Sequence, residues 1–115
     1  MRVAYSTDAG ATFAAPQRID AGNPVGRVDV ELLDDGSAAV SWLERTDSVA
    51  AEVRVRRVRR DGTAGAASVL AQTVGARATG FPRIVRRGDD LIAAWTQTGD
   101  SARVRVVRYP IQGLP

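Results

Sequence analysis

The side chains of this sequence that could take part in chemistry are carboxylates, arginines and two tyrosines, Tyr5 and Tyr109. The chain has no Cys and no His, which excludes thiol nucleophiles, imidazole bases, disulfide bridges and the usual zinc sites. All 16 basic residues are Arg, and the net charge is +3. Because a guanidinium group binds planar anions through paired hydrogen bonds, this composition favours contacts with carboxylates or phosphates. We expect no metal and no cofactor.

The most specific pattern is the stretch Ser6-Thr-Asp8-Ala-Gly10-Ala-Thr12-Phe13. Ser and Asp side chains hydrogen-bond the backbone amides of their own tight turn. Gly10 can take the positive φ that such a turn needs, and Phe13 can pack back between strands. The pattern therefore predicts a self-contained turn, in which Ser6, Asp8, Gly10, Thr12 and Phe13 have structural roles.

Short strands must position these groups. Apolar and polar residues alternate at period two in windows such as residues 53–56 and 104–106, and no window sustains a helical stripe. Asp- and Gly-containing turn signals, as at residues 34–36 and 60–62, separate the windows. We therefore predict an all-β fold with strands near residues 2–6, 12–19, 27–33, 38–44, 52–59, 67–70, 83–86, 91–97 and 102–109.

An internal repeat groups these strands. Trp42 and Trp95 lie 53 residues apart, and the segment 53–58 returns as 104–109 at a spacing of 51. A period of about 50 residues with four short strands is typical of a β-propeller blade. Because the two tryptophans hold equivalent positions in the repeat, we interpret them as core residues.

The repeat predicts a partial β-propeller of about two and a half four-stranded antiparallel blades, in one domain. Residues 1–22 would end one blade and contain the turn, residues 23–73 would form a full blade, and residues 74–115 would form a three-stranded last blade. We expect the tail after Tyr109 to be an edge or coil, since it carries proline at both ends.

The eight-residue pattern matches the Asp box, or BNR repeat, of sialidases and related propellers. The chain as a whole resembles the C-terminal part of bacterial exo-α-sialidase-like BNR proteins. Besides the box, the resemblance is carried by residues 5–8, 26–30, 40–44 and 80–84, and it covers nearly the whole chain. The equivalent turn at residues 59–63 lacks the Ser and the Asp-x-Gly spacing, so only the first blade keeps a proper box.

The resemblance also implies where a glycan would bind. Retaining sialidases use a Tyr nucleophile activated by a Glu, an Asp acid/base, and a cluster of Arg residues that clamps the substrate carboxylate. It implies substrate-binding candidates at the innermost strands and the loops of one face, namely Arg27, Arg83, Asp29 and Glu44. Structural ion pairs would explain the same residues. Neither tyrosine matches the position of the nucleophile, so no catalytic residue is identified in this chain.

Three functional hypotheses remain open. The chain is the C-terminal portion of a sialidase-like glycoside hydrolase of the exo-α-sialidase type, inactive alone, with a secreted or periplasmic parent and a sialoside or other glycan as ligand. Alternatively, it belongs to a non-catalytic BNR propeller that binds glycans or proteins as a scaffold. In the third hypothesis it is a short protein whose open blade faces are covered by self-association. Its partners would be the remaining blades or further copies, and we predict oligomers or poor solubility for the isolated chain.

Other partners fit the sequence less well. Residues 54–60 contain five arginines, but the valines between them favour a half-buried strand, and no stacking aromatic accompanies them. The chain has no run of about 18 apolar residues, and residues 1–5 lack the apolar core of a signal peptide. We therefore expect neither nucleic acid nor a membrane as a partner, and no secretion signal in this sequence.

Overall fold

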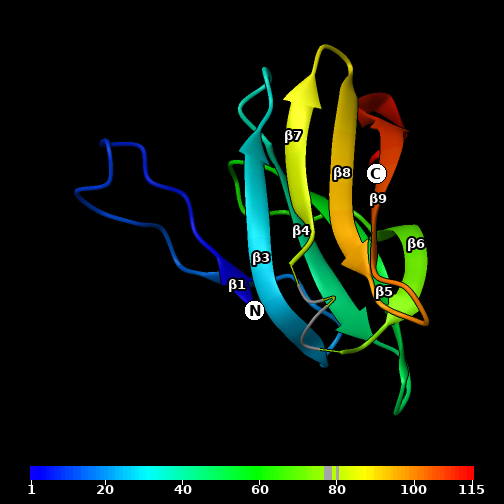
Figure 1. Cartoon of the computed structure of the whole chain (residues 1–115). Helices are drawn as coiled ribbons and strands as arrows, with labels where there is room; N and C mark the ends of the chain where they lie inside the picture. Colours follow the sequence, from blue (N-terminus) through cyan, green and yellow to red (C-terminus); the bar gives the residue numbers. More distant parts are fainter. Residues whose placement is uncertain (77–78, 80) are drawn as a thin grey trace.

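The computed structural model describes residues 1–76, 79 and 81–115, and this part of the chain is all-β, with three antiparallel sheets (Figure 1). The first sheet pairs β1 with β2, the second has the order β3-β4-β5-β6, and the third has the order β7-β8-β9. None of the three closes on itself within the described residues. The strands are β1 (Arg2–Val3), β2 (Gln17–Arg18), β3 (Pro24–Leu32), β4 (Ala38–Arg45), β5 (Ala50–Val58), β6 (Ser68–Val74), β7 (Arg83–Arg87), β8 (Asp90–Gln97) and β9 (Arg103–Pro110), followed by a 3-10 turn, η2 (Ile111–Gly113).

The strands follow the predicted order, but residues 12–19 do not form the long strand expected there. Only Gln17 and Arg18 pair with β1. The turn before them bonds its own backbone amides with side chains, and Pro16 has no N–H to donate, so little of the segment is left for a ladder. In contrast, β6 was expected to end at residue 70 but continues to Val74, where it still pairs with Ala50 of β5.

The internal repeat is visible in the strand registers. Trp42 lies opposite Arg54 in the β4-β5 pair, and Trp95 lies opposite Arg105 in the β8-β9 pair. The second and third sheets therefore place equivalent residues at equivalent points, with the spacings of 53 and 51 read from the sequence.

The second sheet lies between the other two. Toward the first sheet it buries Ala38, Val40 and Val58 together with Ile19, and Met1, Val3 and Tyr5 pack against this cluster. Toward the third sheet, one cluster joins Ala39 and Val55 to Ile84, Leu91 and Ala93, and another joins Leu43, Ala51 and Val53 to Trp95. Full burial stabilises each large apolar side chain by about 1.5–3 kcal/mol, so these two interfaces form the core.

Both tryptophans belong to this core, and each faces the sheet that precedes its own in the chain. Trp95 packs among residues of the second sheet. Trp42 alternates with the residues that face the third sheet, so it shares the side of Ala38 and Val40. The direction of stacking is therefore the same at both interfaces.

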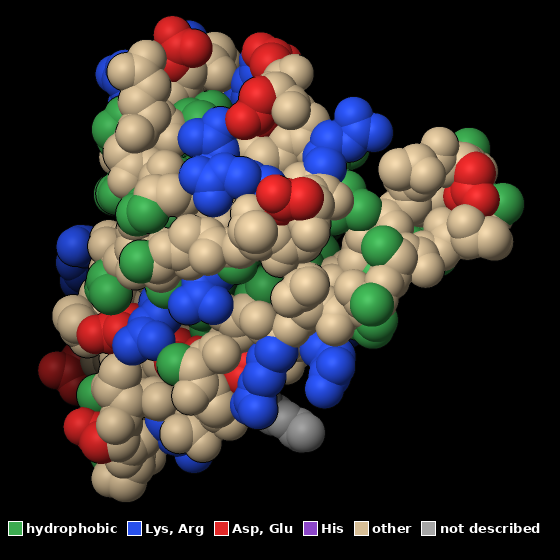
Figure 2. Space-filling model, turned by 180° about the vertical axis from the view of Figure 1, so that it is seen from behind, with side chains coloured by type: hydrophobic (Ala, Val, Ile, Leu, Met, Phe, Trp, Pro, Cys, Tyr) green, Lys and Arg blue, Asp and Glu red, His purple; other side chains and the backbone are tan. Residues whose placement is uncertain are grey.

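Two apolar surfaces stay uncovered. The first sheet packs over β4 and β5 but leaves one side of β3 open, where Val28, Val30 and Leu32 are 49–66% exposed. On the outer side of the third sheet, Val85, Val104 and Val106 are 55–70% exposed. We call these the β3 surface and the third-sheet surface. Seen from behind, acidic and basic side chains are interspersed over the body, and the segment between β1 and β2 projects from it (Figure 2).

Candidate functional site

The Ser6–Phe13 turn is held by its own polar side chains. Ser6 Oγ accepts a hydrogen bond from the Gly10 amide at 2.8 Å and donates to Asp8 Oδ1 at 2.8 Å. Asp8 in turn accepts from the Thr12 amide at 2.9 Å and from the Thr12 hydroxyl at 2.5 Å. Gly10 has φ of 90°, a conformation that favours glycine. The hydrogen bonds from the Thr12 hydroxyl and amide, followed by that from Ser6, lower the pKa of Asp8 to about 2.

Phe13 differs from the expectation that it packs between strands, since it is 65% exposed. The physical reason lies in the first sheet, whose two paired strands have only two residues each. No further strand lies beside the turn in the described part of the chain, so the ring has nothing to pack between. The Phe13 ring is therefore largely exposed, and the turn is held by the hydrogen bonds of Ser6 and Asp8.

The equivalent turn after β5 is smaller. Asp61 accepts hydrogen bonds from the amide and hydroxyl of Thr63, only two residues away, whereas Asp8 reaches four residues to Thr12. Gly62 supplies the positive φ of 87°. The altered spacing noted in the sequence thus corresponds to a tighter turn.

Two of the four substrate-binding candidates meet across adjacent sheets. Asp29 of β3 accepts hydrogen bonds from Arg83 Nε and from the Ile84 amide, both at 2.9 Å and both to Oδ2. Strands β3 and β7 lie side by side (Figure 1). Asp29 lies opposite Ser41 and Arg83 opposite Ala94, so the two residues hold equivalent positions in the repeat. We call this contact the Asp29 latch.

A second contact joins equivalent positions nearby. The Arg27 guanidinium carbon lies 5.0 Å from the centre of the Phe81 ring, a cation–π distance. Phe81 was not singled out from the sequence, although its alignment with Arg27 in the repeat was a signal for it. Gly80, which contributes to the family resemblance, and residues 77 and 78 lie outside the described residues.

Glu44, the fourth candidate, is not brought together with the other three. It lies on the face of the second sheet opposite to that of Asp29, is 2% exposed, and accepts hydrogen bonds from three N–H groups. The donors are the Ala21 amide at 3.1 Å, the Asn23 amide at 2.7 Å and Trp42 Nε1 at 2.6 Å. Burial raises the pKa of Glu44, but these hydrogen bonds outweigh it and hold the pKa below its ordinary value. The carboxylate thus fastens the loop before β3 to the core.

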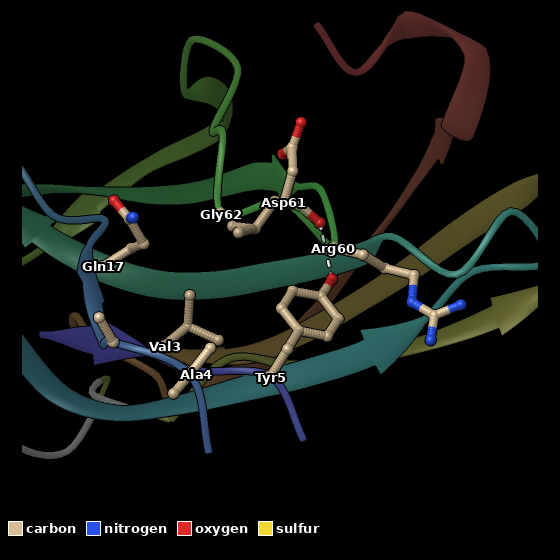
Figure 3. A pocket seen from close by; sticks show the side chains of 10 residues that line it. Val3, Ala4, Tyr5, Gln17, Arg60, Asp61 and Gly62 are labelled. Atoms are coloured by element: carbon tan, nitrogen blue, oxygen red, sulfur yellow. Dashed lines mark hydrogen bonds between the residues drawn. The ribbon is translucent and has the colours of Figure 1, made fainter. Parts of the chain in front are cut away.

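Both tyrosine hydroxyls are engaged in structural hydrogen bonds. Tyr5 donates to the Val58 carbonyl at 2.7 Å, beside a small hollow lined by Val3, Gln17 and the Arg60–Gly62 turn (Figure 3). Burial, followed by the charge of Asp35, raises the pKa of Tyr5. Tyr109 lies 3.2 Å from Ser68 Oγ and donates to the Gly113 carbonyl at 3.1 Å. A raised pKa keeps the Tyr5 phenol protonated, which is the opposite of an activated nucleophile.

Among the described residues no three Asp or Glu side chains are grouped so that they could hold a metal ion. In the same part of the chain, no helix has the length and apolar character needed to cross a membrane.

The contacts between β3 and the β7 region bring together two guanidinium groups, one carboxylate and one aromatic ring, which are the groups that could bind a ligand there. The chain matches no family model, no curated protein and no solved structure.

Proposed function

We propose that this chain forms part of an Asp-box β-propeller of the sialidase-like type, as a C-terminal portion that is inactive alone. The second sheet would be a complete blade, the first sheet the outer strands of the blade before it, and the third sheet most of the blade after it. The observation that carries this proposal is the shared register of the second and third sheets, in which Asp29 and its repeat equivalent Arg83 meet. Blades that stack around an axis make such contacts between equivalent positions of neighbours.

The uncovered surfaces support the same proposal. The β3 surface is exposed where the first sheet would lack its two inner strands, and the third-sheet surface is exposed where a following blade would pack. Exposed apolar patches of this kind mark surfaces that another protein segment covers. The parent propeller would supply that cover on both sides.

A glycan site would be built around Arg27, Phe81 and Arg83. Guanidinium groups bind the carboxylate of a sialoside, and an aromatic ring packs against a sugar face. In this arrangement Arg83 would exchange the Asp29 carboxylate for that of the ligand. Both tyrosine hydroxyls of the chain are held in structural hydrogen bonds, so a glycosidase parent would carry its nucleophile in other blades.

The second candidate is a non-catalytic propeller scaffold that binds glycans or proteins. It is favoured by the Asp29 latch, because the Arg83 guanidinium is already paired with the Asp29 carboxylate of the neighbouring sheet. In that case Arg83 is an exposed member of the contact between two blades and has no role in substrate binding.

A sialoside assay and a binding titration test the proposal together. With a fluorogenic sialoside we expect no turnover by the isolated chain, and turnover that Tyr5→Phe abolishes would overturn the assignment as inactive. In a nuclear magnetic resonance titration with sialyllactose, we expect shifts of the Arg27 and Arg83 side-chain N–H signals that lactose does not cause. Shifts that are equal for both sugars, or absent for both, would contradict the glycan site and favour a scaffold that binds proteins.

A further inference from the structure

The second sheet places a buried tryptophan beside two carboxylates near the end of β4. Trp42 lies opposite Arg54, and Glu44 lies opposite Glu52, so these four side chains share one face of the sheet. Trp42 Nε1 donates to Glu44 at 2.6 Å, and Arg54 Nε donates to Glu52 at 2.7 Å. We call these four residues the second-sheet quartet. In it, the indole and the guanidinium each have a carboxylate as their acceptor.

The third sheet has the same four positions with two different side chains. Trp95 lies opposite Arg105, and Gln97 lies opposite Arg103, and we call these residues the third-sheet quartet. Gln97 and Arg103 hold the positions of the two carboxylates of the second-sheet quartet. The tryptophan and one arginine are therefore kept, whereas one carboxylate is replaced by an amide and the other by a second guanidinium.

The donors of the third-sheet quartet have no carboxylate to bind. Trp95 is 6% exposed, and its Nε1 group is buried without a hydrogen-bond partner among the described residues. Arg103 bonds Ser101 Oγ at 3.2 Å, and neither it nor Arg105 pairs with a carboxylate in that part of the chain. A buried donor without an acceptor is unfavourable, so the indole N–H indicates a place where an acceptor binds.

These donors line two adjoining hollows. Trp95, Gln97 and Arg105 line the hollow between β6 and β9, and Gln97 and Arg105 continue with Arg103 into the hollow at the β8–β9 hairpin. The hairpin hollow has a volume of about 280 Å³, below the range of about 300–1,000 Å³ for pockets that hold drug-sized ligands, so a small ligand suits it best. Asp100 also lines this hollow, and two guanidinium groups would hold an anion there against its charge.

We propose that the third-sheet quartet binds a small organic dicarboxylate, whose two acid groups take the places of the two carboxylates of the second-sheet quartet. One carboxylate accepts the Trp95 N–H, as Glu44 accepts that of its own tryptophan. The other binds the guanidinium groups of Arg103 and Arg105. The site uses none of the residues that join β3 to β7, and a dicarboxylate can bind it whether or not the chain belongs to a propeller.

A titration with glutarate, followed by nuclear magnetic resonance, tests this site in the full chain. Trp42 and Trp95 are the only tryptophans, so the chain has two indole N–H signals. We expect glutarate to move the Trp95 signal downfield and saturably, because this N–H gains a carboxylate acceptor. The Trp42 signal should stay in place, since its N–H is already bonded to Glu44. Butyrate, which lacks one carboxylate, should bind about fivefold more weakly, and glutaramide, which lacks both charges, should not bind.

A carboxylate restored to the third sheet provides a sharper test. In Gln97→Glu the Trp95 signal should move downfield without any ligand, and glutarate should bind at least about tenfold more weakly, because the new side chain takes the place of one of its acid groups. Thr96→Glu is the matched control, since it adds the same charge on the opposite face of β8, and it should change the affinity by less than about twofold. Arg103→Gln should weaken glutarate binding about fivefold, whereas Asp100→Asn should not weaken it.

Four results would overturn the proposal. A Trp95 signal that glutarate leaves unmoved would show that no carboxylate reaches the indole. Equal affinities for glutarate and butyrate, or equal losses in Gln97→Glu and Thr96→Glu, would show that the protein attracts negative charge without a built site for two carboxylates. Inorganic phosphate that binds as tightly as glutarate would identify a general anion site in place of a dicarboxylate site.

Discussion

Glu44 is a buried carboxylate whose charge is compensated by N–H groups. Among the described residues no guanidinium bonds it directly, and two loop amides and an indole N–H surround its oxygens. Burying an ion without such donors would be strongly unfavourable, and donors that prefer the ionised form lower its pKa. The sequence predicted Glu44 to follow the second strand of the full repeat, whereas it lies within β4, one residue before the end of that strand. It could not show these partners, because the donors lie more than 20 residues away in the chain or depend on the rotamer of Trp42.

Replacing Glu44 with Gln keeps its size but turns an NH₂ group toward one of the three donors. We expect Glu44→Gln to lower the free energy of unfolding by about 2 kcal/mol, the penalty for an unsatisfied buried donor. Urea denaturation followed by tryptophan fluorescence measures this change. Glu31→Gln, on neighbouring β3, is the matched control and should change stability by less than about 0.5 kcal/mol.

The effect of Glu44→Gln on the free energy of unfolding should depend on pH. The pKa of folded Glu44 is lowered, so its stabilising effect is complete above the ordinary value of 4.5 and is lost as pH falls through the lower folded pKa. The stability difference between the parent chain and Glu44→Gln should therefore narrow in acid. A difference that stays constant from neutral pH to pH 3 would show that the ionised carboxylate does not hold the loop.

The strands themselves were largely predictable, because period-two alternation and Asp-Gly turns are local signals. Residues 12–19 show the limit of such reasoning, since their turn and Pro16 removed the hydrogen-bonding groups that a ladder needs. Contacts between sheets could not be predicted from such local signals. Arg83 and Asp29 were singled out separately, but 54 residues of chain separate them, and only the stacking of β3 beside β7 brings them together.

The Asp29 latch allows a test of how the second and third sheets are joined. Asp29→Ala removes both the ion pair and the acceptor for the Ile84 amide, and we expect a loss of about 1–2 kcal/mol in the free energy of unfolding. Arg83→Ala removes only a largely exposed ion pair, and we expect a loss of less than about 0.5 kcal/mol. Urea denaturation of the two variants and of the double variant measures the difference. A larger effect of Arg83→Ala would mean that the latch depends on charge and not on the bond to the backbone.

The three stacked sheets leave two apolar surfaces open. The first sheet covers only part of the second sheet and leaves one side of β3 open, and the third sheet is covered on one side only. The opening over β3 follows from the first sheet having two strands against the four of the second sheet, and the opening on the third sheet follows from its place at the end of the stack. Which valines would remain exposed depended on how far the first sheet reaches over β3, and no sequence pattern reports that distance.

We expect the chain to self-associate through these surfaces. Sedimentation velocity at increasing protein concentration should show oligomers, and replacing Val28, Val30 and Leu32 together with Thr should shift the distribution toward monomer. Val49→Thr is the control, since Val49 is 63% exposed in the loop before β5 and lies on neither surface. A parent chain that sediments as a monomer at every concentration would show that the open surfaces do not drive association.

The Asp29 latch pairs unlike side chains at equivalent positions of the two repeats. At one position of the repeat the second sheet has Asp29 and the third sheet has Arg83. Two residues earlier the second sheet has Arg27 and the third sheet has Phe81. Two identical copies of the second sheet placed in succession would bring aspartate against aspartate, and two copies of the third would bring arginine against arginine. The differences between the two repeats therefore favour one order of packing between neighbouring sheets. A tandem array of identical sheets would not have this preference.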